Sequence, residues 1–275
     1  MRNTRKMWAV IAIAGSLFAI QCQKESLNTP EPEQEAEAYD VTGELKCAGD
    51  KTFYGPAVHM GNGAVRTFVV EDRNGDPKAV GILMSKKALD NLPHDMTEFV
   101  LEFPKASDQD FYTHATVDWN PAGHEPEHVY TLPHFDFHFY TIPLEERLAI
   151  GPNDTIQFEN LPDSIYIPPF YFKGPGGVPQ MGSHWVDLLS PEISGSGIFT
   201  KTFIWGSYDG KFTFWEPMVT RDYLLSNPVN SFTAVRQPQA YQRSGWYAQN
   251  YKVSYNSRNG ERIVALTNLV YVEGQ

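Results

Sequence analysis

The chain has 275 residues and a formal net charge of −11 at pH 7, from 33 acidic against 22 basic side chains. Nucleic acids and anionic membrane surfaces repel such an acidic protein, so neither is expected as a partner. The chain is long enough for one domain with a substantial core after a leader has been removed.

Residues 1–21 have the pattern of a secretion signal. Arg2, Arg5 and Lys6 make a positively charged start, and an uncharged apolar stretch follows from Met7 to Ile20. That stretch is shorter than the roughly 20 apolar residues that a membrane-spanning helix needs. We therefore expect a signal peptide that directs export.

Cys22 directly follows this segment, at the place where a bacterial lipoprotein carries its lipid-modified cysteine. Gln21 departs from the small residue that is usual before such a cysteine, whereas the polar residues after it are similar to the relaxed lipoprotein signals of some Gram-negative bacteria. We expect Cys22 to anchor the protein in the cell envelope, facing the periplasm or the cell exterior, with plain secretion as the main alternative. If Cys22 is lipidated, Cys47 is the one remaining cysteine and no intramolecular disulfide can form.

Residues 22–40 are expected to form an acidic, disordered tether. Pro30 and Pro32 stand among several glutamates, and no apolar periodicity is present. Such a composition buries too little apolar surface to offset the entropy lost on ordering, and its like charges keep it extended. A single β-rich domain is expected from residue 41 to residue 275.

Within this domain, short apolar runs are separated by strong turn signals. Strand-like runs flank Asn74-Gly75, Asp209-Gly210 and Asn259-Gly260, and such dipeptides favour tight turns between antiparallel strands. Two more strands are expected at 97–103 and 112–117. The predicted fold class is mainly β, an antiparallel sandwich or open barrel with a few short helices.

Three short helices are expected at 85–92, 143–149 and 220–226. The first begins with a serine that is suited to an N-cap, and the second has proline in its first turn. Residues 162–182 are rich in proline and glycine and are expected to form an irregular, partly buried loop.

The most informative segment is Pro133 to Tyr140, which reads P-H-F-D-F-H-F-Y. Successive side chains of a strand point to opposite faces, so His134, Asp136 and His138 share one face and the three phenylalanines share the other. The three phenylalanine rings need an apolar core in which to pack. The polar groups need a polar partner, a metal ion or water, because an unpaired buried polar group costs about 1–3 kcal/mol. We expect the polar triplet to line a concave surface.

Three residues from other segments are candidates for the same site: His124, His184 and Glu216. Imidazole and carboxylate groups are the ligands that Zn²⁺ and other divalent transition metals favour. His134 and His138 are about 13 Å apart along a regular strand, so one ion cannot easily bind both. A metal site would combine one pair from the strand with His184, His124 or Glu216.

Other interpretations of these residues remain open. The polar row can line a metal-free, water-filled pocket, or the histidines can have unrelated roles. The sequence contains neither H-E-x-x-H nor C-x-x-C, and it lacks the G-x-S-x-G motif of a serine nucleophile. Aromatic residues around 205–215 and 246–251 can form a carbohydrate-stacking surface, although such residues more often fill a sandwich core.

Several blocks together resemble a known family. They are 120–126, 129–130, 133–140, 180–187, 190–192, 203–210 and 214–218. The family comprises secreted bacterial proteins of unknown function, and its founding structural member is an envelope protein of Thermus under extracytoplasmic sigma-factor control. The resemblance implies coverage from about residue 54 to residue 226, one β-rich extracytoplasmic domain, and a joint site formed by the six candidate residues. It implies no reaction, because the family has no established activity.

Two alternative functions therefore remain. The first is a lipid-anchored envelope protein whose His/Asp pocket binds a small ligand or has a structural role, without a required cofactor. The alternative is a divalent-metal-binding protein, or a metal-dependent hydrolase, that uses the same pocket with an ion such as Zn²⁺. The sequence lacks a convincing nucleophile, which favours the first.

Overall fold

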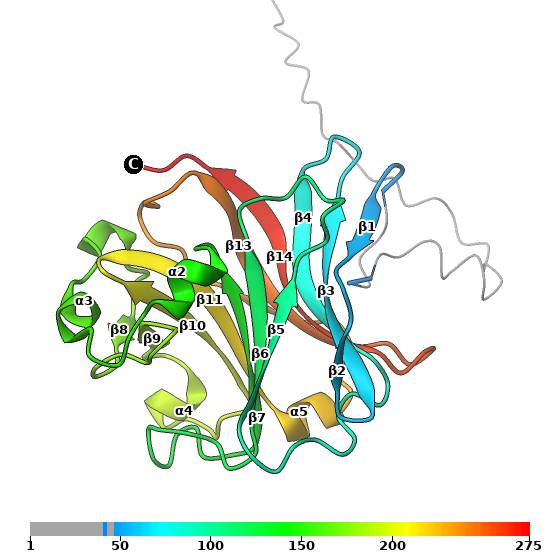
Figure 1. The fold of residues 1–275 in the computed structure, drawn as a ribbon, viewed down its shortest axis with the longest axis horizontal. Helices are drawn as coiled ribbons and strands as arrows, with labels where there is room; N and C mark the ends of the chain where they lie inside the picture. The colour runs from blue at the N-terminus through cyan, green and yellow to red at the C-terminus, as the bar shows by residue number, and fades with distance from the viewer. Residues whose placement is uncertain (1–40, 43–46) are drawn as a thin grey trace, which may run out of the picture.

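The computed structural model describes residues 41–42 and 47–275, which form two seven-stranded antiparallel sheets packed face to face (Figure 1). The first sheet has the order β1-β3-β4-β14-β13-β12, with β2 paired to β3, and the second has the order β5-β6-β7-β11-β10-β9-β8. Each order is linear with two free ends, so neither sheet closes into a barrel. The prediction of a mainly β fold is confirmed.

The strands of the first sheet are β1 (Lys51–Tyr54), β2 (Val58–Met60), β3 (Gly63–Glu71), β4 (Pro77–Met84), β12 (Ser231–Ala234), β13 (Gly245–Tyr255) and β14 (Arg262–Val272). Those of the second are β5 (Thr97–Glu102), β6 (His114–Asn120), β7 (His134–Tyr140), β8 (Tyr171–Lys173), β9 (Ser183–Asp187), β10 (Lys201–Tyr208) and β11 (Lys211–Thr220). The short helices are α2 (Leu144–Leu148), α3 (Thr155–Glu159), η1 (Ser164–Tyr166), α4 (Pro191–Ser194) and α5 (Arg221–Leu225).

All three predicted hairpin turns join antiparallel neighbours, namely β3 with β4, β10 with β11, and β13 with β14. Asp209 and Gly210 both have positive φ, at 48° and 77°. At the other two turns it is Gly75 and Gly260 that take the positive φ. The turn chemistry thus fixed these strand pairs locally, because glycine adopts this backbone region at no steric cost.

The helix predictions were partly wrong. Helices α2 and α5 lie where they were expected, and the hydroxyl of Thr220 caps α5 by accepting from the amide of Tyr223. Residues 85–92 instead form turns, because the Ser85 hydroxyl accepts from the Ala64 amide across the sheet and does not cap a helix. The supposed loop 162–182 also contains η1 and β8.

The main core lies between the sheets, and β7 runs through the middle of the second one. The rings of Phe135, Phe137 and Phe139 are fully buried in that core. The polar face of β7 points away from the first sheet, as its alternation predicted. It is also buried, with His134, Asp136 and His138 at most 5% exposed. The expected concave surface is therefore not exposed to solvent at these three side chains.

Connecting segments cover this outer polar face of the second sheet. Arg147 of α2 lies over the ring of Tyr140 at the end of β7 and forms an ion pair with Glu98 of β5. Near the other end of β7, Tyr130 and Phe199 pack with Ile204 and Met218 in a small separate hydrophobic cluster. Water is thereby kept from most of the polar groups, which strengthens their mutual electrostatic interactions.

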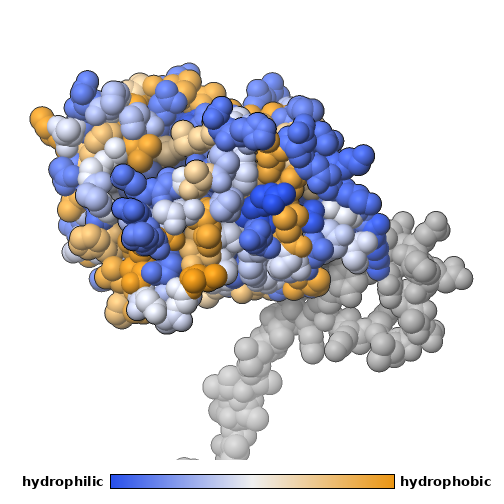
Figure 2. Space-filling model, turned by 90° about the horizontal axis from the view of Figure 1, so that it is seen from below, coloured by the Kyte–Doolittle hydropathy of each residue, from blue (hydrophilic) through white to orange (hydrophobic). Residues whose placement is uncertain are grey.

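The surface seen from below mixes apolar and polar residues over small areas (Figure 2). Among the described helices, none has the length and hydrophobicity required to cross a membrane. The predicted signal peptide, the tether and Cys22 lie outside the described residues.

Candidate functional site

Strand pairing brings the outer polar face together from four strands. Across β6 and β7, Thr116 pairs with His138 and Asp118 pairs with Asp136. Met218 of β11 pairs with Asp136, which places Glu216, two residues earlier on the antiparallel β11, beside His138. Further along the sheet, β9 adds His184.

The six candidate residues fall into two groups of three. In the first, which we call triad A, the Nε2 atoms of His138 and His184 each lie 3.6 Å from Oε2 of Glu216. In the second, triad B, Asp136 lies between His134 and His124. Within each triad, the three potential ligand atoms are all within 4.8 Å of one another. Each triad is a two-histidine, one-carboxylate set.

Residues of β6 contact the His138 ring of triad A on the side away from Glu216. Nδ1 of His138 is 3.1 Å from both the Thr116 hydroxyl and Oδ2 of Asp118. These oxygens orient the ring, so that its Nε2 points at Glu216. Neither that Nε2 nor Glu216 Oε2 makes a hydrogen bond to any described protein group. Oxygen groups that hold the rear nitrogen of a histidine are typical of metal-ligating imidazoles.

Triad B is fixed in a similar way. Asn120 donates a 2.7 Å hydrogen bond to Oδ2 of Asp136. Nδ1 of His134 lies 2.7 Å from the Leu132 carbonyl oxygen, and Nδ1 of His124 lies 2.6 Å from the Glu125 carbonyl oxygen. The rear nitrogens of both rings are therefore occupied, and the Nε2 atoms face the carboxylate.

The buried charges shift one another's pKa values. Burial opposes the charged form of His138, but Glu216 and Asp118 outweigh it and raise the pKa of His138 to about 9. Burial and the charge on His138 lower the pKa of His184 to about 3, while burial raises the pKa of Glu216. In triad B, burial opposes ionisation of Asp136, yet the two neighbouring histidines hold its pKa well below the usual range. The triads therefore form one electrostatically coupled cluster.

Sequence reasoning missed the supporting residues Thr116, Asp118 and Asn120. The predicted strand ended at Val117, whereas β6 continues to Asn120. The alternation H-A-T-V-D-W-N over 114–120 carries the same signal as the motif in β7 and identifies a second polar row. Tyr130 was also missed. Its buried hydroxyl has no hydrogen-bond partner among the described residues, and burial raises its pKa, so it is a neutral donor near the cluster.

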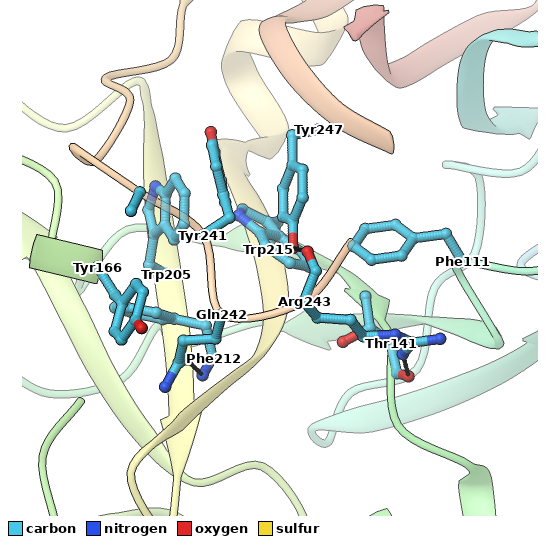
Figure 3. A pocket seen from close by; sticks show the side chains of 11 residues that line it. Phe111, Thr141, Tyr166, Trp205, Phe212, Trp215, Tyr241, Gln242, Arg243 and Tyr247 are labelled. Atoms are coloured by element: carbon cyan, nitrogen blue, oxygen red, sulfur yellow. Dashed lines mark hydrogen bonds between the residues drawn. The ribbon is translucent and has the colours of Figure 1, made fainter. Parts of the chain in front are cut away.

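The aromatic residues considered for carbohydrate stacking mostly lie in the main core. Trp205, Trp215 and Tyr247 line a cavity of about 30 Å³ between the sheets, together with Tyr241 and Arg243 (Figure 3). A volume of this size accommodates about one water molecule. It does not fit a sugar ring, so the carbohydrate interpretation finds no support there.

His114, on the same face but outside both triads, predicts acid sensitivity. Burial, followed by Arg147, lowers the pKa of His114 to about 4. Between this value and the ordinary 6.5, the unfolded chain binds a proton that the folded chain does not, so stability falls on acidification through this window. The variant His114→Phe keeps a ring stacked on Tyr140. We expect its free energy of unfolding to fall by about 1–3 kcal/mol less than that of the wild type between pH 7 and pH 4. Urea unfolding at both pH values measures this, and an equal pH dependence in both proteins contradicts it.

One family model matches part of the chain. Residues 72–119 match the family described as TTHB210-like (hypothetical protein TTHB210), which confirms the resemblance to the Thermus family. The matched segment runs through β4 and β5 to Trp119 of β6, so it includes Thr116 and Asp118. Neither curated proteins nor solved structures gave a match. The family description assigns no activity.

Proposed function

We propose that this chain is an exported, lipid-anchored envelope protein that binds a divalent transition-metal ion through triad A. The convergence of His138, His184 and Glu216 carries the proposal. Imidazole nitrogens with one carboxylate oxygen suit Zn²⁺ and Fe²⁺ better than Mg²⁺ or Ca²⁺, which prefer oxygen ligands. The ion would be held by the three side chains, while Asp118 and Thr116 orient the His138 ring.

The distances in triad A support a tetrahedral ion. Two ligand atoms that each lie about 2.1 Å from a tetrahedral Zn²⁺ are roughly 3.4 Å apart. Both Nε2 atoms lie 3.6 Å from Glu216 Oε2, close to this value. A direct hydrogen bond between these groups requires a separation nearer 2.9 Å. The spacing therefore fits a shared ion better than a self-contained hydrogen-bonded network.

The metal test uses the full chain, purified without chelators or an affinity tag that binds metal. Elemental analysis of the wild type is compared with His184→Ala, and we expect the variant to lose one equivalent of metal. His114→Phe serves as the matched control, because His114 lies on the same buried face outside the triads, and its metal content is expected to be unchanged. A wild type that holds far less than one equivalent of metal, and that gains no Tm when Zn²⁺ is added, contradicts the proposal and supports a metal-free pocket.

A metal-dependent hydrolase is the second candidate. Triad A supplies three ligands, and a site with three protein ligands leaves a fourth position for the water that Zn²⁺ activates. The side chain of His184 is 24% exposed and gives the triad a side that faces solvent. Hydrolysis of activated esters and phosphoesters by the wild type, compared with His184→Ala, tests this candidate. Equal rates in the two proteins exclude it for those substrates.

The export part of the proposal rests on the sequence around Cys22. We expect cells fed radiolabelled palmitate to label the wild-type protein and not Cys22→Ser. Label that persists in the variant contradicts lipidation at this residue. An intact N-terminus found in the cytosol contradicts export altogether.

A further inference from the structure

We infer that triad B is a second divalent transition-metal site, separate from triad A and partly exposed to solvent. The Nε2 atom of His134 lies 3.1 Å from Oδ1 of Asp136, and that of His124 lies 3.3 Å from Oδ2. Neither His134 Nε2 nor Asp136 Oδ1 has a hydrogen-bond partner among the described residues. The three potential ligand atoms of triad B thus lie within 4.8 Å of one another.

The tautomers of the two rings point to a cation. A carbonyl oxygen only accepts hydrogen bonds, so the contacts to Leu132 and Glu125 place the hydrogen of each neutral ring on Nδ1. A neutral ring in this tautomer directs its Nε2 lone pair at the Asp136 carboxylate, which is unfavourable unless a proton or a metal ion lies between them. Protonating both rings instead would put two cations in contact, because the ring centroids are 4.6 Å apart. A single metal ion lets both rings remain neutral.

The two triads are expected to hold separate ions. Asp136 and His138 are next neighbours on one face of β7, which separates their Cα atoms by about 6.6–6.8 Å. Two-metal clusters with bridging ligands need ions about 3.5–4 Å apart. Each triad has its own carboxylate, and no described carboxylate contributes to both.

Triad B differs from triad A in how one ligand is supplied. His134 and Asp136 are fixed on β7, but His124 belongs to the segment that connects β6 to β7, and its side chain is 38% exposed. The connection is held by a hydrogen bond in which the carbonyl of Tyr130 accepts from the His124 amide. We therefore expect the ion in triad B to exchange with solution faster than the ion in triad A.

The experiment counts metal in four full-length proteins: the wild type, His124→Ala, His184→Ala and the double variant. We expect the wild type to hold two equivalents of metal, each single variant to hold one, and the double variant to hold none. Titration with Co²⁺ gives a second readout, because each tetrahedral site adds visible absorption, and His124→Ala should lose about half of it. His128→Asn is the matched control, since His128 lies on the same connection with its side chain 89% exposed and with a φ of 67° that asparagine tolerates.

The outcomes separate this inference from the proposed function, on which it rests only for the class of ion. Loss of one equivalent in His124→Ala supports triad B, even if His184→Ala binds as much metal as the wild type. Unchanged metal content and Co²⁺ absorption in a folded His124→Ala overturn the inference, even if His184→Ala loses metal. Far-ultraviolet circular dichroism checks that the His124→Ala variant is folded.

Discussion

Phe137→Ala is expected to lower the free energy of unfolding by about 3–5 kcal/mol, as a truncation of a large buried ring. Phe137 is completely buried in the main core, on the face of β7 opposite His134, Asp136 and His138. The change leaves a cavity that the two packed sheets cannot readily fill. For a domain of this size, the loss corresponds to a fall in Tm of roughly 6–20 °C. Urea unfolding followed by tryptophan fluorescence measures it.

Phe172→Ala is the matched control, because its ring is on edge strand β8 and is 60% exposed. We expect its free energy of unfolding to differ from that of the wild type by no more than about 0.5 kcal/mol. Equal losses in the two variants would mean that burial on β7 does not determine the stability of this sheet. That result contradicts the assignment of the phenylalanine face to the core.

Metal binding is expected to stabilise the fold strongly. An ion that binds only the folded state adds about 4 kcal/mol when its free concentration is 1,000 times Kd. Triad A has one residue on each of β7, β9 and β11, so the proposed ion would link strands that unfolding separates. We expect the wild type to gain this stability on adding Zn²⁺ and to lose it again on adding a chelator. Thermal unfolding at several Zn²⁺ concentrations provides the measurement.

Glu216→Gln tests the same effect with almost no change of shape. Glutamine keeps the volume of the buried side chain but removes the negative oxygen, so triad A should lose its share of the metal-dependent gain. Glu127→Gln, at a side chain that is 83% exposed, is the control and should behave as the wild type. A Glu216→Gln protein that gains as much stability as the wild type rules out Glu216 as a ligand.

Local patterns in the chain were sufficient for part of this picture. The alternation in 133–140 correctly separated the core face of β7 from its polar face, since the side-chain period of a strand is two residues. The turn dipeptides correctly marked three hairpins for a similar local reason. The expected helix at 85–92 failed because the cap hydroxyl of Ser85 bonds to the distant Ala64 amide, which no local pattern reveals.

The sequence by itself determined which residue types share a face of β7 and named six polar residues as one candidate site. The tertiary structure decided that they form two triads, that the face is covered, and that Asp118 and Asn120 support it. Those features depend on the register between β7 and its neighbours β6 and β11. Register between strands distant in sequence is set by packing of the whole sandwich, so it cannot be read from any single segment.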